Sequence, residues 1–466
     1  MRIVIDMQGA QSISSTRGIG RYTCSIVESI ARNKADHDIF IVFNGLFPDA
    51  IEPLKTLLSP YIPDENFKIW TVVGPVDCIP TENNTRRAIA EAMRETFFAS
   101  LQPDMILIAS LVEGFGDNAV NSIGNTPWKI PVAVIFYDVI PLILYDLYLA
   151  GHPQFEIAYT EKINHLRKAE LLLAISDSAK KEAIQYLSKI EKNVVNISAA
   201  ADAHFKKISI SEIEKKQLFS KLKIQKPFLL YSGGSDDRKN QRKLIDAYAL
   251  LPQDLRDQYQ LVLAGGLPDF HKIQFIEHIE NRGFDNAQII ITGRISDIEM
   301  IQLYNLCTLY VFPSLHEGFG LPALEAMSCG APVIGSNVSS IPEVIGNPDA
   351  LFDPNSALLI SEKIHSVLSN QDTLDALKSH ANKQVEKFSW DISGVRAIDA
   401  IQTSYLNYQQ TLTQDLPHDD ISPRYPDQLQ YRAYLVKAAA QLAKTSLSDI
   451  ELRSIATAID KNHPIL

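Results

Sequence analysis

The chain has 466 residues, enough for two or three domains of roughly 150 residues each. A formal net charge of -11 argues against a general nucleic-acid-binding role, and a hydrophobic content of 46% argues against disorder. The four cysteines include no Cys-x-x-Cys pair, which argues against a disulfide framework or a zinc site and favours a reducing cytoplasm.

Neither export nor membrane insertion is expected. The chain opens on MRIVID, which predicts a strand and lacks the basic flank and apolar core of a signal peptide. The most apolar region, 131–149, is interrupted by Asp138 and Asp146, whereas a membrane span needs about 20 predominantly apolar residues.

Short apolar runs alternate with helix-length segments along most of the chain. They are IVID, IFIVFNG, MILIAS, PVAVIFYD, ELLLAIS, PFLLYSGG, YQLVLAGG, AQIIITG, LYVFPS and PVIGS. Nearly continuous apolar strands joined by helices are typical of buried parallel sheets, and ten strands are too many for one compact sheet. We therefore expect an α/β fold with two Rossmann-like, doubly wound lobes facing a cleft, over residues 1–205 and 206–388.

A helical region is expected after the second lobe. Residues 389–413 predict a helix that returns to the first lobe, and 414–466 predict a linker followed by a helical extension. Ser448 and Glu451 resemble a capping box at the start of the last helix. The extension is either a helical hairpin packed on a lobe or a docking element for a partner or a following module.

The most informative stretch is FPSLHEGFGLPALEAMSCGAPVIGS, which predicts a strand, a glycine-containing loop and a short helix. Pro322 suits the first turn of this helix and Gly330 suits its end. Unpaired backbone N–H groups at a helix start favour an anion, so Gly320 and Leu321 suit a phosphate or diphosphate.

Glu317 and Glu325 lie on the loop and the helix, so both can border one ligand. Their carboxylates accept hydrogen bonds from hydroxyl groups, which sugars and ribose present. The structural alternative is a solvated Glu317 and a Glu325 that pairs with a nearby cation.

This Glu-x7-Glu segment resembles the signature of retaining glycosyltransferases of family 4, which have the two-lobed GT-B fold. The resemblance implies that Glu317 contacts the donor sugar and that Glu325 contacts the ribose hydroxyls of a nucleotide sugar. It also implies that the backbone of Phe319, Gly320 and Leu321 borders the donor.

The same resemblance gives a role to YSGGSDDRKNQRKLIDAY, in which Arg238 and Lys239 are expected to open a helix. Two fixed cations there would offset the negative charge that a diphosphate leaving group gains as the glycosidic bond breaks. Many members carry a further Arg directly after the first Gly of this turn, where this chain has Gly234. The alternative is a solvated basic helix start.

Other expected site residues also rest on the resemblance. Arg294 and Ile295 follow a strand at the position that lies beside the nucleobase in relatives, and Gly18 and Gly20 form a loop near the donor phosphates and the acceptor. We expect these glycines just before a helix that begins near Arg21.

Asp138 follows a strand end where many relatives have a His before the Asp, whereas this chain has Tyr137. We assign Asp138 to the catalytic centre by resemblance and leave the role of Tyr137 open. The alternative is that both residues only cap a buried strand.

The leading hypothesis is a retaining α-mannosyltransferase. Within the family, the opening MRIVIDMQGAQ and the Glu-loop segment look most like bacterial O-polysaccharide and lipopolysaccharide enzymes. The resemblance implies a nucleotide-sugar donor, GDP-mannose, and a glycan or lipid-linked glycan acceptor, with no cofactor and no metal. It also implies a cytoplasmic protein with peripheral attachment to the inner membrane and a second transferase module or polymerase partner, since the tail is similar to the segment that joins tandem modules.

Two other function classes stay open. A catalytically silent nucleotide-sugar-binding module of a glycan polymerase complex would explain the departures at Tyr137 and Gly234. An NAD-linked oxidoreductase or epimerase would share the fold, but its GxGxxG fingerprint is incomplete because Thr23 takes the last glycine position.

Overall fold

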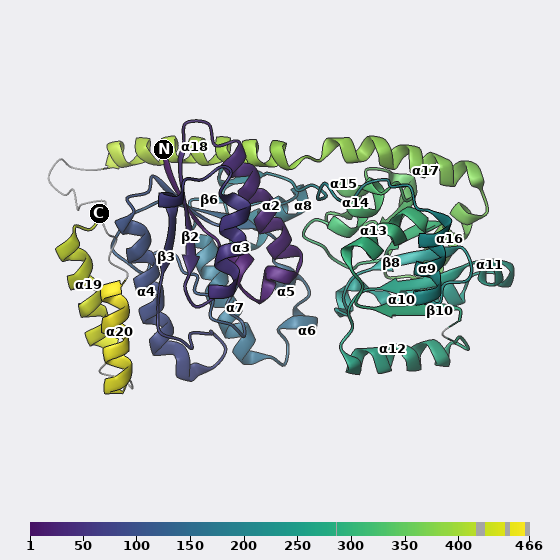
Figure 1. Ribbon diagram of the computed structural model, residues 1–466, viewed down its shortest axis with the longest axis horizontal. Coiled ribbons are helices and arrows are strands. Elements are labelled where there is room, and N and C mark those ends of the chain that lie inside the picture. Colours follow the sequence, from purple (N-terminus) through teal and green to yellow (C-terminus); the bar gives the residue numbers. More distant parts are fainter. Residues whose placement is uncertain (286, 416–424, 443–447, 462–466) are drawn as a thin grey trace. The chain divides into compact units, whose positions relative to one another are not determined.

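A computed structural model describes residues 1–285, 287–415, 425–442 and 448–461 (Figure 1). The chain divides into two units, which are described separately below. Unit 1 combines Met1–Ser198 with the residues from Trp390 onward, and unit 2 is Ala199–Ser389. Residues 416–424 of the expected linker lie outside the described residues.

Unit 1 is built on a seven-stranded sheet in the order β3-β2-β1-β4-β5-β6-β7, in which every pairing is parallel. The strands are β1 (Arg2–Asp6), β2 (Asp38–Asn44), β3 (Phe67–Trp70), β4 (Met105–Ile108), β5 (Val132–Phe136), β6 (Leu171–Ala174) and β7 (Val194–Asn196). The helices before residue 198 are α1 (Gln8–Gln11), α2 (Gly18–Arg32), α3 (Pro48–Leu58), α4 (Asn84–Ser100), α5 (Ile140–Ile143), α6 (Tyr145–Tyr148), α7 (Pro153–Lys168) and α8 (Asp177–Leu187).

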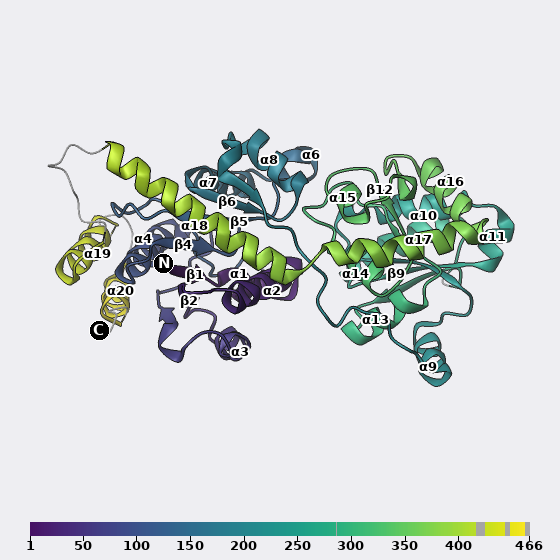
Figure 2. The same ribbon diagram turned by 90° about the horizontal axis from the view of Figure 1, so that it is seen from above.

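The last helices complete unit 1. The long helix α18 (Trp390–Asp415) packs on α2 and on β6, and Figure 2 shows it running along this unit. Helix α19 (Gln428–Leu442) packs on α4, and α20 (Asp449–Lys461) packs on α19. The expected capping box is present, because the Ser448 hydroxyl and the Glu451 carboxylate bond each other's backbone N–H.

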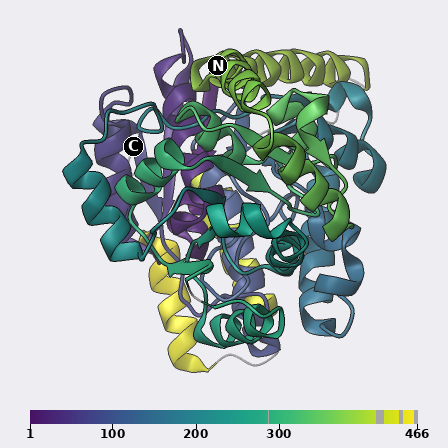
Figure 3. The same cartoon turned by 90° about the vertical axis from the view of Figure 1, so that its right-hand side faces the viewer.

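Unit 2 has a six-stranded parallel sheet in the order β10-β9-β8-β11-β12-β13, with helices around it (Figures 1 and 3). The strands are β8 (Phe228–Ser232), β9 (Gln260–Ala264), β10 (Ile289–Gly293), β11 (Leu309–Phe312), β12 (Val333–Ser336) and β13 (Leu351–Phe352). The helices are α9 (Glu212–Leu222), α10 (Gln241–Ala249), α11 (Gln253–Gln258), α12 (Asp269–Asn281), α13 (Asp297–Leu306), α14 (Leu321–Ser328), α15 (Ile341–Ile345), α16 (Ala357–Leu368) and α17 (Gln371–Gln384).

The expected α/β class with two doubly wound parallel sheets is confirmed, with local differences. Strands β3, β7 and β13 lie outside the ten predicted apolar runs, because β3 and β7 are short edge strands and β13 is two residues long. Helix α8 is capped by the Ser176 hydroxyl, which accepts from the backbone N–H of Ala179. Among the described helices, none is both long and apolar enough to cross a membrane.

Candidate active site

The strand order of unit 2 reverses between β8 and β11, which pair directly at the centre of the sheet. In open α/β sheets, ligands bind outside the carboxyl ends of the strands at such a switch point. The loop after β8 carries Arg238 and Lys239, and the loop after β11 carries Glu317. Topology therefore brings two of the predicted motifs to one place.

These three side chains form a buried ion cluster. The Glu317 carboxylate accepts from Arg238 Nη1 at 2.8 Å through Oε2 and from Lys239 Nζ at 2.6 Å through Oε1. Arg238 Nη1 also donates to the His316 carbonyl at 2.8 Å. Glu317 is 6% exposed, and the side chains of Arg238 and Lys239 are 19% and 14% exposed. Two positive charges are thus held beside one carboxylate, away from most of the solvent.

The pKa values reflect this burial and pairing. Burial alone raises the pKa of the Glu317 carboxyl, but the charges and hydrogen bonds of Arg238 and Lys239 outweigh it and bring the pKa to about 2. Burial lowers the pKa of the Lys239 ammonium, and the Glu317 carboxylate opposes that shift. Glu317 is therefore ionised over the whole physiological pH range.

Local backbone structure places the two cations on a tight turn. Asp236 caps a 3-10 turn over Asp237–Lys239, and Asn240 has a left-handed backbone with φ of 60° before α10 begins at Gln241. Asn adopts this conformation more readily than most residues, and its amide donates to the carbonyls of Pro313 and Pro354 at 3.0 and 2.8 Å. The expectation that Arg238 and Lys239 open an α-helix is wrong. They lie in the 3-10 turn, and α10 begins two residues after Lys239.

Serine hydroxyls fix the Glu317 loop. Ser340 Oγ donates to the carbonyls of Glu317 and Phe319 at 2.8 and 2.7 Å, and the Glu317 N–H donates to Ser339 Oγ at 3.0 Å. Gly320 precedes α14 with φ of 108°, a conformation that favours glycine. The Phe319 side chain is 4% exposed and packs edge-on against Phe388 at 5.7 Å. At Phe319 and Gly320, therefore, only the backbone is suited to meet a ligand.

Glu325 lies on α14, and its carboxylate accepts from the Tyr304 hydroxyl at 3.2 Å. The same hydroxyl lies 2.8 Å from Ser232 Oγ at the end of β8. The sequence analysis did not identify Tyr304 or Ser232. Nothing in their local sequence marks them, because the contact depends on how α13 packs against the sheet.

Arg294 and Ile295 follow β10, at the edge of the sheet. Arg294 is exposed beside the Gly265–Gly266 turn, and Ile295 is half-buried before the Ser296 cap of α13. They share the carboxyl edge of the sheet with the ion cluster, but β9 separates their strand from β8.

In unit 1, both predicted glycines lie inside α2, which begins at Gly18 and not near Arg21. Gly18 has open space around it, whereas a Cβ at Gly20 would lie 2.6 Å from the Ser14 carbonyl and would also overlap Ser15. Close packing of the turn 13–16 on the helix therefore explains why position 20 requires glycine. The turn packs against the helix at Gly20, while Gly18 at the helix start is exposed.

Asp138 and Tyr137 follow β5. The Asp138 carboxylate accepts from the Ile140 backbone N–H at 3.0 Å, which fixes the turn into α5. The Tyr137 hydroxyl donates to the Ala109 carbonyl at 3.1 Å and lies 3.0 Å from Thr23 Oγ1. Burial raises the pKa of Tyr137 well above its ordinary value. Tyr137 thus remains neutral and joins the ends of two strands to α2.

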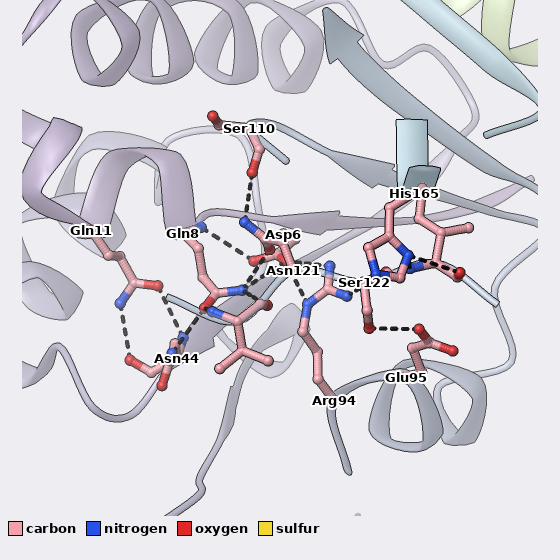
Figure 4. Close-up of polar contacts among 12 residues, drawn as sticks. Asp6, Gln8, Gln11, Asn44, Arg94, Glu95, Ser110, Asn121, Ser122 and His165 are labelled. Atoms are coloured by element: carbon pink, nitrogen blue, oxygen red, sulfur yellow. Dashed lines mark hydrogen bonds and ion pairs between the residues drawn. The ribbon is translucent and has the colours of Figure 1, made fainter. Parts of the chain in front are cut away.

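A buried polar network supports the carboxyl edge of the unit 1 sheet (Figure 4). Arg94 on α4 donates to Asp6 Oδ2 through Nε at 2.8 Å and Nη2 at 2.5 Å, and the two side chains are 1% and 0% exposed. Gln8 Nε2 donates to the same oxygen at 3.0 Å, and Asn44 Nδ2 donates to Gln8 Oε1 at 2.8 Å. The network ties α1 to the ends of β1 and β2.

Glu113 is a further residue that was not predicted from the sequence. Its buried carboxylate accepts from the hydroxyls of Ser12, Ser14 and Ser110 at 2.8, 2.9 and 2.8 Å. Burial raises its pKa, and the serine hydrogen bonds oppose that shift. Glu113 therefore fixes the turn that precedes Gly18.

Among the described residues, Glu91, Glu161 and His165 form one group whose potential metal-ligand atoms lie within 4.8 Å of one another. Arg87 lies 3.6 Å from Glu91 and 2.8 Å from Glu161, so a cation already balances both carboxylates. This arrangement is that of an ion-pair network.

Known proteins similar to this chain include glycosyltransferases. Residues 213–384 match the family model described as glycosyl transferases group 1. The chain is 38% identical over 414 residues to the serotype-specific mannosyltransferase WbdA from Escherichia coli, covering 88% of this chain and 49% of that protein. The chain spans about half the length of the mannosyltransferase relatives of this name that it matches.

Solved structures show the same fold. The complex of Anabaena HepE with UDP and glucose is 18% identical with a TM-score of 0.58, over 89% of this chain and all of that one. WaaG, a glycosyltransferase of lipopolysaccharide biosynthesis, is 16% identical with a TM-score of 0.58, over 86% of this chain and 99% of that one. The expected likeness is confirmed: the chain has the GT-B fold, matches the group 1 glycosyltransferase model over residues 213–384, and is similar over 88% of its length to a serotype-specific mannosyltransferase.

Proposed function

We propose that the chain is a retaining mannosyltransferase that moves mannose from GDP-mannose to a growing bacterial surface glycan and forms an α-linkage. The observation that carries this proposal is the buried Arg238–Glu317–Lys239 cluster at the switch point of unit 2. The names of the relatives support the choice of mannose and of an O-antigen product.

In the proposed reaction, the acceptor hydroxyl attacks the anomeric carbon from the face that the phosphate leaves. The bond from this carbon to the diphosphate breaks, the new glycosidic bond forms, and the departing phosphate oxygen takes the acceptor proton. Arg238 and Lys239 offset the charge that develops on the leaving group, and their fixed positions mean that little reorganisation is needed. Glu317 holds both cations through separate oxygens and borders the sugar.

The proposal gives Glu325 the task of binding the ribose hydroxyls, since it lies on the helix that follows the Glu317 loop. The proposed reaction needs no metal ion, because Arg238 and Lys239 offset the charge on the leaving group. We propose a glycan or lipid-linked glycan as acceptor, with peripheral attachment at the inner membrane. We further propose that a second transferase module or polymerase partner acts with this chain, because the WbdA relatives are about twice as long.

The test is nucleoside diphosphate release by the purified chain with GDP-mannose, UDP-, ADP- and dTDP-sugars, in the presence of a mannose oligosaccharide. We expect GDP release that depends on the acceptor, a product heavier by one hexose, and an α-anomeric signal by NMR. Glu317→Ala is the negative control, with Glu362→Gln on the exposed face of α16 as the matched carboxylate control.

A different active donor would overturn the choice of GDP-mannose while leaving a glycosyltransferase. Tight GDP binding without transfer to any acceptor would overturn the enzyme proposal and favour a nucleotide-sugar-binding module. A β-linked product would overturn the retaining reaction.

A further inference from the structure

Three hydroxyl groups form a buried chain that ends at Glu325. Tyr310 on β11 has its hydroxyl 2.9 Å from Ser232 Oγ, and Ser232 Oγ lies 2.8 Å from the Tyr304 hydroxyl. Tyr304 then donates to Glu325 Oε2 at 3.2 Å. The exposed fractions of Tyr310, Ser232 and Tyr304 are 0%, 4% and 1%, while Glu325 is half-buried.

The chemistry of these groups fixes the direction of the hydrogen bonds that run from Tyr310 to Glu325. An ionised carboxylate only accepts hydrogen bonds, so Tyr304 must use its single proton on Glu325. Ser232 must then donate to Tyr304, and Tyr310 must donate to Ser232. Tyr304 and Ser232 each donate once and accept once, and Tyr310 donates once, so all three contacts are satisfied in only one arrangement. Hydrogen bonds aligned in this way polarise one another in the same sense.

We propose that Tyr304 is a positioning residue that holds the Glu325 carboxylate for the nucleotide ribose, and that Ser232 and Tyr310 orient the Tyr304 hydroxyl. This inference rests on the proposed function, which gives Glu325 its contact with ribose. Tyr304 acts through Glu325 and touches no donor atom itself.

The surroundings of Tyr304 suit this task. Its ring lies edge-on to Tyr310 at 5.5 Å and to Phe205 at 6.0 Å, so the hydroxyl points from a fixed ring. The helix that carries it, α13, starts with a complete capping box of Ser296 and Glu299. Burial also raises the pKa of Tyr304 well above its ordinary value, which keeps the donated proton in place.

Unit 2 thus contains a carboxylate whose orientation is set before a ligand arrives. A flexible Glu side chain loses conformational entropy when it is ordered. This entropic cost weakens ligand binding unless the folded protein already holds the side chain in place. Here the three hydroxyl groups hold the Glu325 carboxylate in place. They lie in the core of unit 2 and belong to three different elements, β8, α13 and β11.

The first experiment compares Tyr304→Phe with the wild type in binding of GDP and of 2′-deoxy-GDP. We expect the Kd for GDP to rise about tenfold, the size of a lost hydrogen bond to a charged group, and the Kd for 2′-deoxy-GDP to change much less. In turnover, the KM for GDP-mannose should rise while kcat stays within about threefold of the wild type, because the hydroxyl chain does not touch the leaving group.

The matched control is Tyr248→Phe. Tyr248 is another fully buried tyrosine of unit 2, and its hydroxyl donates to the Tyr259 carbonyl at 2.7 Å. This variant should lose stability and keep the preference for GDP over 2′-deoxy-GDP. A double-mutant cycle with Glu325→Ala adds a second readout, since Tyr304→Phe should have no further effect on GDP binding once the carboxylate is gone.

The outcomes separate the inference from the proposed function. If Glu325→Ala binds GDP like the wild type, or if the wild type binds no GDP, the proposed role of Glu325 fails and the inference falls with it. If Glu325→Ala weakens GDP binding but Tyr304→Phe does not, only the inference is overturned. Tyr304 would likewise have a purely structural role if Tyr304→Phe weakened the binding of GDP and of 2′-deoxy-GDP equally. The same would hold if its effect on GDP binding added to that of Glu325→Ala in the double-mutant cycle.

Discussion

Arg238 and Lys239 are the residues whose loss should affect the chemical step most. Each is expected to contribute roughly 2 to 4 kcal/mol to the transition state, as groups aimed at developing charge do. Arg238→Ala combined with Lys239→Ala should therefore lower kcat at least several hundredfold in the assay of nucleoside diphosphate release. Arg242→Ala, which removes an exposed cation from the same segment, is the control and should retain activity. A loss below tenfold in the double variant would mean that the phosphates bind elsewhere.

The ionised state of Glu317 links its pairing to stability. Its pKa falls from an unfolded value of 4.5 to about 2 in the folded chain. A carboxyl with a lowered pKa contributes stability that is fully present above its unfolded pKa and is lost as the pH falls through the folded value. The contribution is on the order of 3 kcal/mol near neutral pH. We expect the difference in unfolding free energy between wild type and Glu317→Gln to shrink from pH 6 to pH 2.5 in urea titrations. A difference that stays constant with pH would show that the ion pairs do not stabilise this site.

Glu317, Arg238 and Lys239 were predicted site residues because their segments resemble the family signature. Their mutual ion pairs were not predicted, and they form because both segments follow central strands of one parallel sheet. Glu113 and Tyr304 were not predicted, since their partners come from distant segments and depend on helix packing. Tyr137 shows the same limit. Its substitution for a family His was visible in the sequence, whereas its hydrogen bond to the Ala109 carbonyl needed the structure.

At the scale of elements, apolar runs predicted the buried central strands, because a strand covered on both faces has few polar positions. Element ends were less predictable. Helix α2 begins at Gly18, inside what the glycine pattern indicated as a loop, and the turn 13–16 packs on it at Gly20. The buried polar network at the ends of β1 and β2 was not predicted, since its Gln and Asn residues are separated by long stretches of sequence.

This network should be expensive to break. Removing Arg94 leaves Asp6 charged and buried, and the loss of one partner of a buried ion pair costs about 3 to 5 kcal/mol. We expect Arg94→Met to lower the Tm of unit 1 by about 10 °C, measured by differential scanning calorimetry. Arg32→Met is the matched control, because Arg32 pairs with Asp391 at the surface, where a salt bridge contributes about 1 kcal/mol at most. Equal shifts for the two variants would contradict a special role for the buried pair.

At the scale of the molecule, the chain leaves unit 1 after Ser198 and returns to it at Trp390. The return is fastened by Ser29 Oγ, which donates to the Trp390 carbonyl at 2.6 Å, and by the ion pair of Arg32 with Asp391. A helix over residues 389–413 that returns to the first lobe was predicted, and α18 takes this place. The close approach of this helix to α2 was not foreseeable, because it depends on one glycine.

That glycine is Gly394, where an added Cβ would lie 2.9 Å from the Ser29 carbonyl oxygen. Gly394→Val would gain less than about 1 kcal/mol of helix propensity and cost about 1 to 3 kcal/mol or more through overpacking against backbone that cannot rotate away. The overpacking cost exceeds the gain in helix propensity, so we expect α2 and α18 to separate. Hydrogen exchange should then quicken in Gly18–Arg32 and in α18, while the strands of unit 2 keep their protection. Gln402→Val places the same side chain on the exposed face of α18 and should leave exchange unchanged. Faster exchange in both units would instead mean that the two units unfold as one, whereas unchanged exchange in α2 would mean that α18 does not stabilise unit 1.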